Sequence, residues 1–195
     1  IYKFKKYIPV IHPSSFIHPL ASVTGNVTIG KNVFVGSGAA LRGDIGEIII
    51  EDGCNIQENC IIHMFPGATV HLKKGSHIGH GAIVHGAQIG ENVLIGMSSV
   101  IMDNVEIGDN CIIGALSLIT EGNKIPERKV VVGNPAKIIK EVSDEMLKWK
   151  TEGTKIYVQL TADCLTSMKE VKPLKKGGKR TKQASSYKTW KNTKK

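Results

Sequence analysis

Aliphatic residues recur at every sixth position along most of this 195-residue chain, and a glycine often follows them. These positions are Ile17, Val23, Ile29, Val35, Leu41, Ile50, Ile56, Ile62, Leu72, Ile78, Val84, Ile89, Ile95, Ile101, Ile107, Ile113 and Ile119. A period of six matches neither one face of a helix nor the two-residue alternation of a strand. It predicts a parallel β-helix, in which three hexads form one triangular coil and the inward aliphatic side chains stack into a continuous core.

The repeat breaks its register at three places. It carries three extra residues around Asp44–Glu47 and four around Phe65–Ala68, and it lacks one residue between Val84 and Ile89. Extra residues in a solenoid bulge outward as surface loops, where binding and catalytic groups concentrate. We therefore expect the two bulges to mark the same functional part of the coil.

The coil register brings two histidines together. His63 and His85 each follow an aliphatic position by one residue, and those positions, Ile62 and Val84, lie one full coil apart. The two imidazoles should stack on one outer face, separated by about the 4.8 Å spacing between strands. That separation suits two ligands of one metal ion with metal–nitrogen bonds of about 2.0–2.1 Å.

His80 lies in the preceding hexad and should project from a different face, where it would not reach the same ion within one chain. A second copy could supply it, since three β-helices around a threefold axis would form three sites between subunits. Three histidines with an open fourth position form a catalytic rather than a structural zinc site. The sequence thus predicts a homotrimer with zinc at its subunit interfaces, iron or cobalt being the alternative metals. His71 and His77 are expected in loops or at the surface, with His77 close enough to line the mouth of the site.

The segments NIQENCIIH (residues 55–63) and GHGAIVHG (residues 79–86) resemble the gamma-class carbonic anhydrase family, in its branch that contains the phenylacetic acid degradation protein PaaY and the carnitine operon protein CaiE. The resemblance covers about residues 1–174 and includes PVIHPSSFIHP near the start, LRGD at 41–44 and VGNPAKIIKEVSDEMLKWK after the repeat. It implies that the β-helix is left-handed and that three copies assemble.

The resemblance also implies roles for individual residues. The family's three metal ligands match His63, His80 and His85. The glutamine that contacts the metal-bound solvent or the substrate matches Gln57. The arginine and aspartate that support the site and the subunit interface match Arg42 and Asp44.

The chain departs from the best-studied carbonic anhydrases of the family in the two bulges. These enzymes carry acidic proton-shuttle residues there, whereas this chain has Ile45 after Asp44, and Met64, Phe65 and Pro66 after His63. The predicted metal site is intact, but fast hydration of carbon dioxide is not indicated. Metal-activated water serves either of two reactions, attack on carbon dioxide or attack on the thioester carbonyl of an acyl-CoA.

Two other functions stay open at this stage. The first is a hexapeptide acyltransferase that uses acyl-CoA, which also forms trimers and often has one catalytic histidine and no metal. The second is a non-catalytic metal-binding protein of a pathway. Bound zinc would argue against the first, and a zinc-loaded protein without turnover would favour the second, because fold alone does not fix function.

Composition favours a cytoplasmic protein, and the resemblance implies a small-molecule substrate, carbon dioxide or an acyl-CoA. No apolar stretch of about 18 residues is present, so no membrane span is expected, and no signal peptide is visible. Cys54, Cys60 and Cys111 fall in an inward slot of the hexads and, like Cys164, show no CxxC spacing. Buried free thiols fit a reducing compartment.

The chain is expected to divide into a β-helix domain (residues 1–135), a helical segment (136–171) and a basic, disordered tail (172–195). The repeat fades after Ile119, and two helices are predicted, with Ser143 and Thr154 as their N-caps. Ten of the 26 basic residues and no acidic residue lie from position 172 onward, so the formal net charge of +9 belongs to the tail. We interpret it as solvated; nucleic-acid binding is disfavoured.

One apolar stripe of the helical segment is expected to pack against the β-helix or a neighbouring subunit. Its members are Ile156, Tyr157, Leu160, Cys164, Leu165 and Met168.

Overall fold

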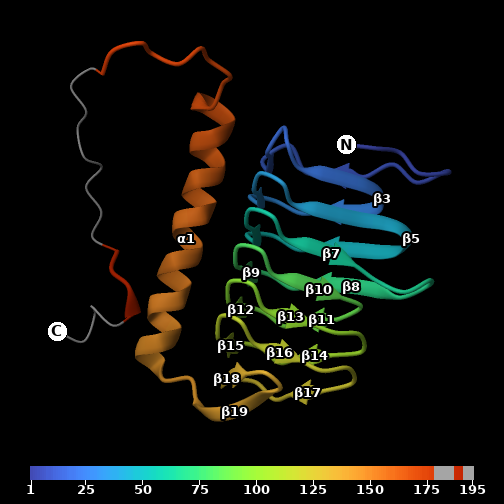
Figure 1. The fold of residues 1–195 in the computed structure, drawn as a ribbon, viewed down its shortest axis with the longest axis vertical. Coiled ribbons are helices and arrows are strands. Elements are labelled where there is room, and N and C mark those ends of the chain that lie inside the picture. The colour runs from blue at the N-terminus through green and yellow to red at the C-terminus, as the bar shows by residue number, and fades with distance from the viewer. Residues whose placement is uncertain (178–186, 191–195) are drawn as a thin grey trace.

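The computed structural model describes residues 1–177 and 187–190; residues 178–186 and 191–195 lie outside the described part. The chain winds into a parallel β-solenoid of about seven turns, with one helix running along its side (Figure 1). Strands stack coil upon coil because each coil places equivalent hexad positions above those of the coil before it. The predicted β-helix is confirmed.

One sheet forms the helix face, which is the side of the solenoid that the helix covers. In stacking order it contains β2 (Phe16–Ile17), β4 (Phe34–Val35), β6 (Asn55–Ile56), β9 (His77–Ile78), β12 (Leu94–Ile95), β15 (Ile112–Ile113), β18 (Lys129–Gly133) and β19 (Ala136–Glu141). Its neighbouring strands pair parallel except β18 and β19, which pair antiparallel and close the end of the stack.

The other two faces share a second sheet, because the long strands β3 (Ser22–Ile29) and β5 (Ala40–Ile50) run across both. The β7 face continues from them through β7 (Ile61–His63), β10 (Ile83–His85), β13 (Val100–Ile101) and β16 (Leu118–Ile119). The third face contains β1 (Val10–Ile11), β8 (Thr69–Leu72), β11 (Gln88–Ile89), β14 (Glu106–Ile107) and β17 (Lys124–Ile125).

The aliphatic positions of the repeat form the core. From Val23 to Ile119 none of these side chains is more than 3% exposed. The repeat also runs further than the sequence indicated, because Ile125 and Val131 are buried at the next two six-residue steps. The prediction that the repeat fades after Ile119 is wrong. Polar turn residues before and after Ile125 hide the six-residue period in this part of the sequence.

Three of the cysteines are core residues, as predicted. Cys54, Cys60 and Cys111 are free and buried. The Cys60 thiol lies 3.1 Å from the carbonyl oxygen of Gly79 in the next coil. Burial raises the pKa of Cys54 to about 12 and that of Cys60 to about 11, so both thiols stay protonated and unreactive.

A single helix, α1 (Asp144–Ser167), follows the solenoid. Ser143 caps it, accepting a hydrogen bond from the backbone N–H of Met146, as predicted. The prediction of two helices is wrong: Thr154 lies inside α1, where its hydroxyl donates to the carbonyl of Lys150. The predicted helical segment of residues 136–171 is also too long, because its first residues form strand β19.

The face of α1 that packs on the solenoid includes only part of the predicted apolar stripe, since Tyr157 packs on Phe34 and His77. Lys150, Gly153, Thr154 and Thr161 are the buried positions, together with Met146 near the N-terminus. Several stripe residues are instead exposed, namely Ile156, Leu160, Leu165 and Met168. Small and polar residues allow the helix backbone to lie close to the coils, so burial on this helix does not follow hydrophobicity.

The two ends of the chain differ. The N-terminal residues are extended over the first coil, where Tyr2 bridges Thr24 and β1 pairs with β3. Most of the predicted disordered tail lies outside the described residues, but residues 187–190 lie against α1, with Trp149 Nε1 donating to the Lys188 carbonyl at 2.9 Å. In the described part of the chain, no helix combines the length and hydrophobicity needed to cross a membrane.

Candidate metal centre

Strand pairing on the β7 face brings His63 and His85 together. β7 and β10 pair with Ile62 beside Val84 and His63 beside His85. The Nδ1 atom of His63 lies 3.3 Å from Nε2 of His85, and the two ring centroids are 5.3 Å apart. The predicted stacking of these two histidines is confirmed.

Each of these imidazoles is held at its other nitrogen by a carboxylate. Asp44 Oδ1 lies 3.1 Å from His63 Nε2, and the two carboxylate oxygens of Asp103 lie 2.7 and 2.8 Å from His85 Nδ1. A carboxylate at the far nitrogen fixes the orientation and raises the basicity of a metal-binding imidazole. The two nitrogens that remain face each other.

Sequence reasoning did not find Asp103. It lies 18 residues after His85, which is one full coil, and that spacing was the available signal. Its side chain reaches His85 over Gly86, where a Cβ atom would lie 2.2 Å from Asp103 Oδ1. Gly86 also has a φ of +59°, which favours glycine. The residue missing from the repeat after Val84 thus shapes the site.

Arg42 and Asp44 lie together at this site, on β5. Arg42 donates to Asp44 Oδ2 from Nη2 at 3.0 Å and from Nε at 3.2 Å. Burial alone would raise the pKa of the Asp44 carboxyl, but its hydrogen bonds to Arg42 and His63 lower that pKa below its usual value. Asp44 therefore stays an anion beside His63.

His80 occupies the turn between β9 and β10, apart from the histidine pair. Its Nδ1 lies 2.6 Å from Glu58 Oε2, and its side chain is 48% exposed. Within the described residues of one chain, no three histidine, cysteine, aspartate or glutamate side chains converge on a common metal position. The expectation that His80 would not reach the ion of its own chain agrees with this, and its role as a ligand stays a prediction.

Gln57 is buried beneath His80 and holds its backbone. Gln57 Oε1 accepts the N–H of His80 at 3.2 Å, and Nε2 donates to Asn55 Oδ1 at 3.0 Å and to His77 Nε2. Both amide donors are thus used within the chain. The predicted contact of Gln57 with solvent or substrate remains a prediction.

His77 is half-buried rather than exposed, because α1 lies over it, and it lines the space between α1 and the solenoid. The Tyr157 ring packs edge-on against the His77 ring, with centroids 5.2 Å apart. Burial, reinforced by the nearby charges of Lys150 and His80, lowers the pKa of His77 to about 3, so this imidazole is neutral at physiological pH. His71 lies where expected, at the surface, paired with Glu51 at 2.7 Å.

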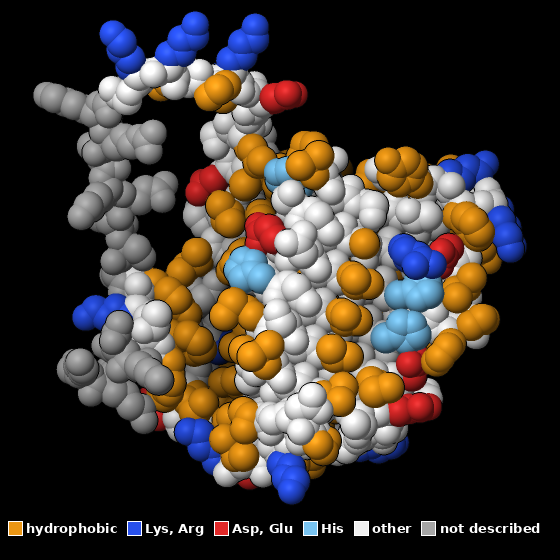
Figure 2. Space-filling view, in the orientation of Figure 1, with side chains coloured by type: hydrophobic (Ala, Val, Ile, Leu, Met, Phe, Trp, Pro, Cys, Tyr) orange, Lys and Arg blue, Asp and Glu red, His pale blue; other side chains and the backbone are white. Residues whose placement is uncertain are grey.

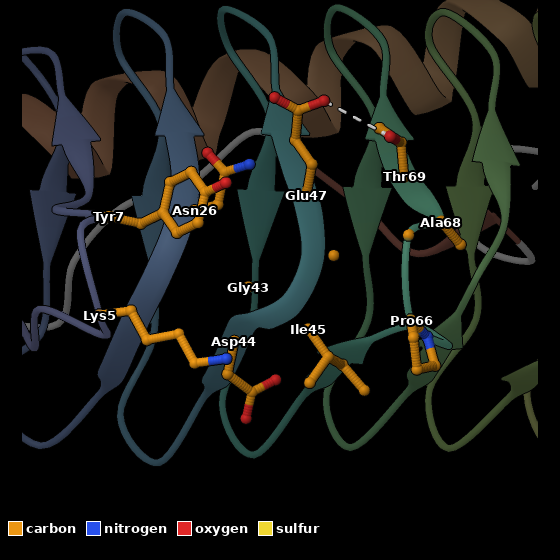
Figure 3. A pocket seen from close by; sticks show the side chains of 12 residues that line it. Lys5, Tyr7, Asn26, Gly43, Asp44, Ile45, Glu47, Pro66, Ala68 and Thr69 are labelled. Carbon is orange, nitrogen blue, oxygen red and sulfur yellow. Dashed lines mark hydrogen bonds between the residues drawn. The ribbon is translucent and has the colours of Figure 1, made fainter.

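The two bulges of the repeat lie side by side, as predicted. The N–H of Gly67 donates to the carbonyl of Ile45 at 2.9 Å, and Glu47 pairs with Thr69. They line a pocket of about 540 Å³ together with the N-terminal segment. Figure 3 shows Lys5 and Asp44 toward one end of this pocket and Glu47 and Thr69 toward the other. The pocket therefore adjoins the aspartate that holds His63.

Comparisons with known proteins agree with the architecture. The family described as bacterial transferase hexapeptide (six repeats) matches residues 8–43 and 86–121, and the hexapeptide repeat of succinyl-transferase matches residues 26–64. The carnitine operon protein CaiE of Salmonella agona is 43% identical over 173 residues, which is 89% of this chain and 87% of the relative. The chain belongs to the CaiE family of hexapeptide-repeat proteins.

Two solved structures share the fold of this CaiE-family chain. A Bacillus cereus protein, described as a candidate acetyltransferase, has 36% sequence identity and a TM-score of 0.81, over 82% of this chain and 93% of its own. A hexapeptide transferase family protein from Anaplasma phagocytophilum has 29% identity and a TM-score of 0.80, over 83% and 95% of the two chains. The resemblance to a hexapeptide-repeat family is confirmed, and both repeat models and both solved relatives carry transferase descriptions.

Proposed function

We propose that this protein is a metal-dependent enzyme that uses activated water to hydrolyse acyl-CoA thioesters or to hydrate carbon dioxide. Zinc would be held by His63 and His85 of one chain and by His80 of the next, in a homotrimer. The observation that carries the proposal is the facing pair of ring nitrogens, each ring backed by a carboxylate.

The spacing of the pair fits a tetrahedral ion. Two ligand nitrogens at zinc–nitrogen bonds of about 2.0–2.1 Å and tetrahedral angles are separated by about 3.3–3.4 Å. His63 Nδ1 and His85 Nε2 are 3.3 Å apart, so an ion would fit between them with little movement. The donors are imidazole nitrogens, which zinc, iron and cobalt all accept.

The surface between the histidines supports a third ligand from a second copy. An outward-facing column of apolar side chains runs along the β7 face, between the histidine pair and the turn that carries His80. Its members are Ala40, Ile61, Ile83, Val100 and Leu118. Figure 2 shows hydrophobic side chains between two separate groups of histidines. Burying this column against another copy is favourable, and a heterologous contact that closes on itself forms a ring.

A bound zinc ion would supply a water nucleophile at neutral pH by lowering the pKa of that water. The chain's own residues hold the geometry: Asp44 and Asp103 orient the two imidazoles, and Gln57 and Glu58 hold His80. In thioester hydrolysis, water adds to the carbonyl, the carbon–sulfur bond breaks, and a carboxylate, a thiol and a proton result.

We favour the thioester reaction over carbon dioxide hydration. The first bulge places Ile45, which is 44% exposed, beside Asp44, and the second places Phe65, which is 60% exposed, against the ring of His85. Neither side chain can carry a proton away. Apolar groups at these positions suit contact with an organic substrate better than rapid proton transfer.

Metal analysis tests the proposal, together with both assays on one preparation. We expect one zinc per chain and thioesterase activity in the wild type, and neither in His80→Ala. His71→Ala is the matched control, since His71 also pairs with a glutamate at the surface and should change neither result. Full zinc and activity in His80→Ala would refute the shared site.

The interface has its own test. Leu118→Glu places a charge in the apolar column and should convert the trimer to monomers, measured by sedimentation, with loss of zinc. Glu106→Lys, an outward position of the third face, should leave the assembly intact. A Leu118→Glu trimer that retains zinc would show that this face is not the contact.

A hexapeptide acyltransferase is the second candidate. The descriptions of the two structural relatives favour it. Metal-free protein that transfers an acyl group from acyl-CoA to an amine or alcohol would support this alternative and displace the first proposal.

A further inference from the structure

A largely apolar groove lies between one part of α1 and the helix face. The helix approaches β2, β4 and β6 most closely, and over β9, β12 and β15 a groove of about 700 Å³ is left. Leu94 and Ile112 form its floor, and Trp149 and Ile156 line it from the helix. Figure 1 shows α1 running along this side of the solenoid.

The C-terminal residues form the outer wall of the groove. The Tyr187 ring stacks on Trp149, with centroids 6.0 Å apart and planes at 18°, and Trp190 lies 6.1 Å from Trp149. Trp190 also packs against the cluster of Val130 and its neighbours. The wall is thus aromatic where the floor is aliphatic.

The polar residues of the groove include a group next to the candidate metal centre. Gln57, His77 and Tyr157 line the groove together with His80, the residue that we propose as a metal ligand. A small-molecule site is typically apolar with a few polar groups that fix orientation. A ligand with one polar end and one apolar end would match this arrangement.

The hydrogen bonds fix the tautomer of His77. The backbone N–H of His80 can only donate, so the Gln57 atom that it contacts is the oxygen, and the amide nitrogen must face His77. His77 Nε2 is therefore an acceptor, and the proton of the neutral ring lies on Nδ1.

That N–H is available to a ligand. Within the described residues, His77 Nδ1 has no hydrogen-bond partner, and Asn55 Nδ2 is the only enclosed side-chain nitrogen or oxygen atom without one. His77 Nδ1 is therefore open rather than sealed in the core. It can donate to a carbonyl oxygen that enters the groove beside His80.

We propose that this groove binds the acyl part of the thioester substrate, with the carbonyl end at His77 and the hydrocarbon chain over Leu94 and Ile112. The proposal rests on the proposed function and names its substrate class: apolar acyl groups longer than acetyl. The groove links chain-length recognition to the metal centre, because Gln57 bonds both His77 and the backbone of His80.

Binding can be measured without turnover. The chain has two tryptophans, Trp149 and Trp190, and both line the groove, so their fluorescence reports its occupation. His63→Ala protein, which should lack metal and activity, would be titrated with acetyl-, butyryl-, hexanoyl- and octanoyl-CoA. We expect the affinity to rise about fourfold for each added methylene group, as hydrophobic burial predicts.

Two variants separate the ends of the groove. In the same background, Ile112→Phe should fill the floor and remove the dependence on chain length. Leu94→Phe is a second floor variant with the same expected effect, which keeps the test valid if Ile112→Phe does not fold. His77→Phe should weaken all acyl-CoAs by a similar factor and keep the chain-length dependence. Glu106→Phe is the control, as an outward strand position far from α1 that should change nothing.

The outcomes distinguish the two proposals. Equal affinity for acetyl-CoA and octanoyl-CoA, or an unchanged chain-length preference in both floor variants, would overturn the groove even if the wild type hydrolyses thioesters. A chain-length preference that Ile112→Phe abolishes would establish the groove even if no hydrolysis were found.

Discussion

Lys150 should make the stability of this protein rise with pH. This lysine is 3% exposed, and its Nζ donates to the Gly75 carbonyl at 2.6 Å and to Asn92 Oδ1 at 2.7 Å, which docks α1 on the solenoid. Burial lowers its pKa from 10.5 to about 7, with a smaller opposing effect of Cys54. Between these two values the unfolded chain binds a proton that the folded chain does not, so stability increases as the pH rises through this window.

The size of the effect follows from the two pKa values. Integrating the linkage relation from pH 7 to pH 9 gives about 2 kcal/mol of added stability from Lys150. Urea unfolding would be followed by tryptophan fluorescence at pH 7, 8 and 9 and at one protein concentration, since an oligomer's stability depends on concentration. Lys150→Met keeps the length of the side chain but cannot titrate, so it should lack this increase.

The comparison with Lys150→Met is needed because other groups act in the opposite direction. Burial raises the pKa values of Cys54 and Tyr157 to about 12, so these groups destabilise the fold as the unfolded chain loses their protons at high pH. They are present in both proteins and cancel in the difference. Parallel pH profiles for the wild type and the variant would show that Lys150 is charged in the folded state at pH 7 to 9.

Two further predictions concern the metal centre. Asp103→Asn should weaken zinc binding about 10- to 100-fold because His85 loses its orienting carboxylate, as measured by competition with a chelator. Asp109→Asn is the control, since the Asp109 carboxylate accepts the Glu91 N–H and touches neither histidine of the pair; equal affinities of the Asp103→Asn protein and the wild type would exclude the role of Asp103. Gly86→Ala should destabilise the fold by at least about 1 kcal/mol in urea unfolding, since it combines a positive φ with a contact to the Asp103 carboxylate; unchanged stability would contradict that contact.

The sequence was sufficient to predict the fold because the solenoid is built from a local repeat. A six-residue period specifies which side chains point inward, and those residues are buried from Val23 to Ile119. Position along the repeat also predicted that His63 and His85 would be neighbours, since a parallel stack converts sequence spacing into register. The same logic would have found Asp103, one coil after His85, if carboxylates had been searched at that spacing.

The helix could not be predicted equally well, because its packing does not follow its apolar pattern. The residues that dock α1 are Lys150 and small or polar neighbours, whereas Ile156 and Leu160 remain exposed. Docking depends on how closely two backbones approach and on carbonyl groups that the solenoid presents to Lys150. Neither is visible in a single segment of sequence. The partial burial of His77 was not predicted for the same reason, since it comes from Tyr157 on that helix.

The three breaks in the repeat all shape the histidine site, and this is the strongest argument that the site is functional. The first bulge carries Asp44 to His63, the second places Phe65 against His85, and the missing residue beside Gly86 lets Asp103 reach His85. A solenoid gains nothing in core packing from such irregularities, because each one interrupts an otherwise uniform stack. Their convergence on two facing imidazole nitrogens is what a catalytic metal site requires and what a purely structural coil does not.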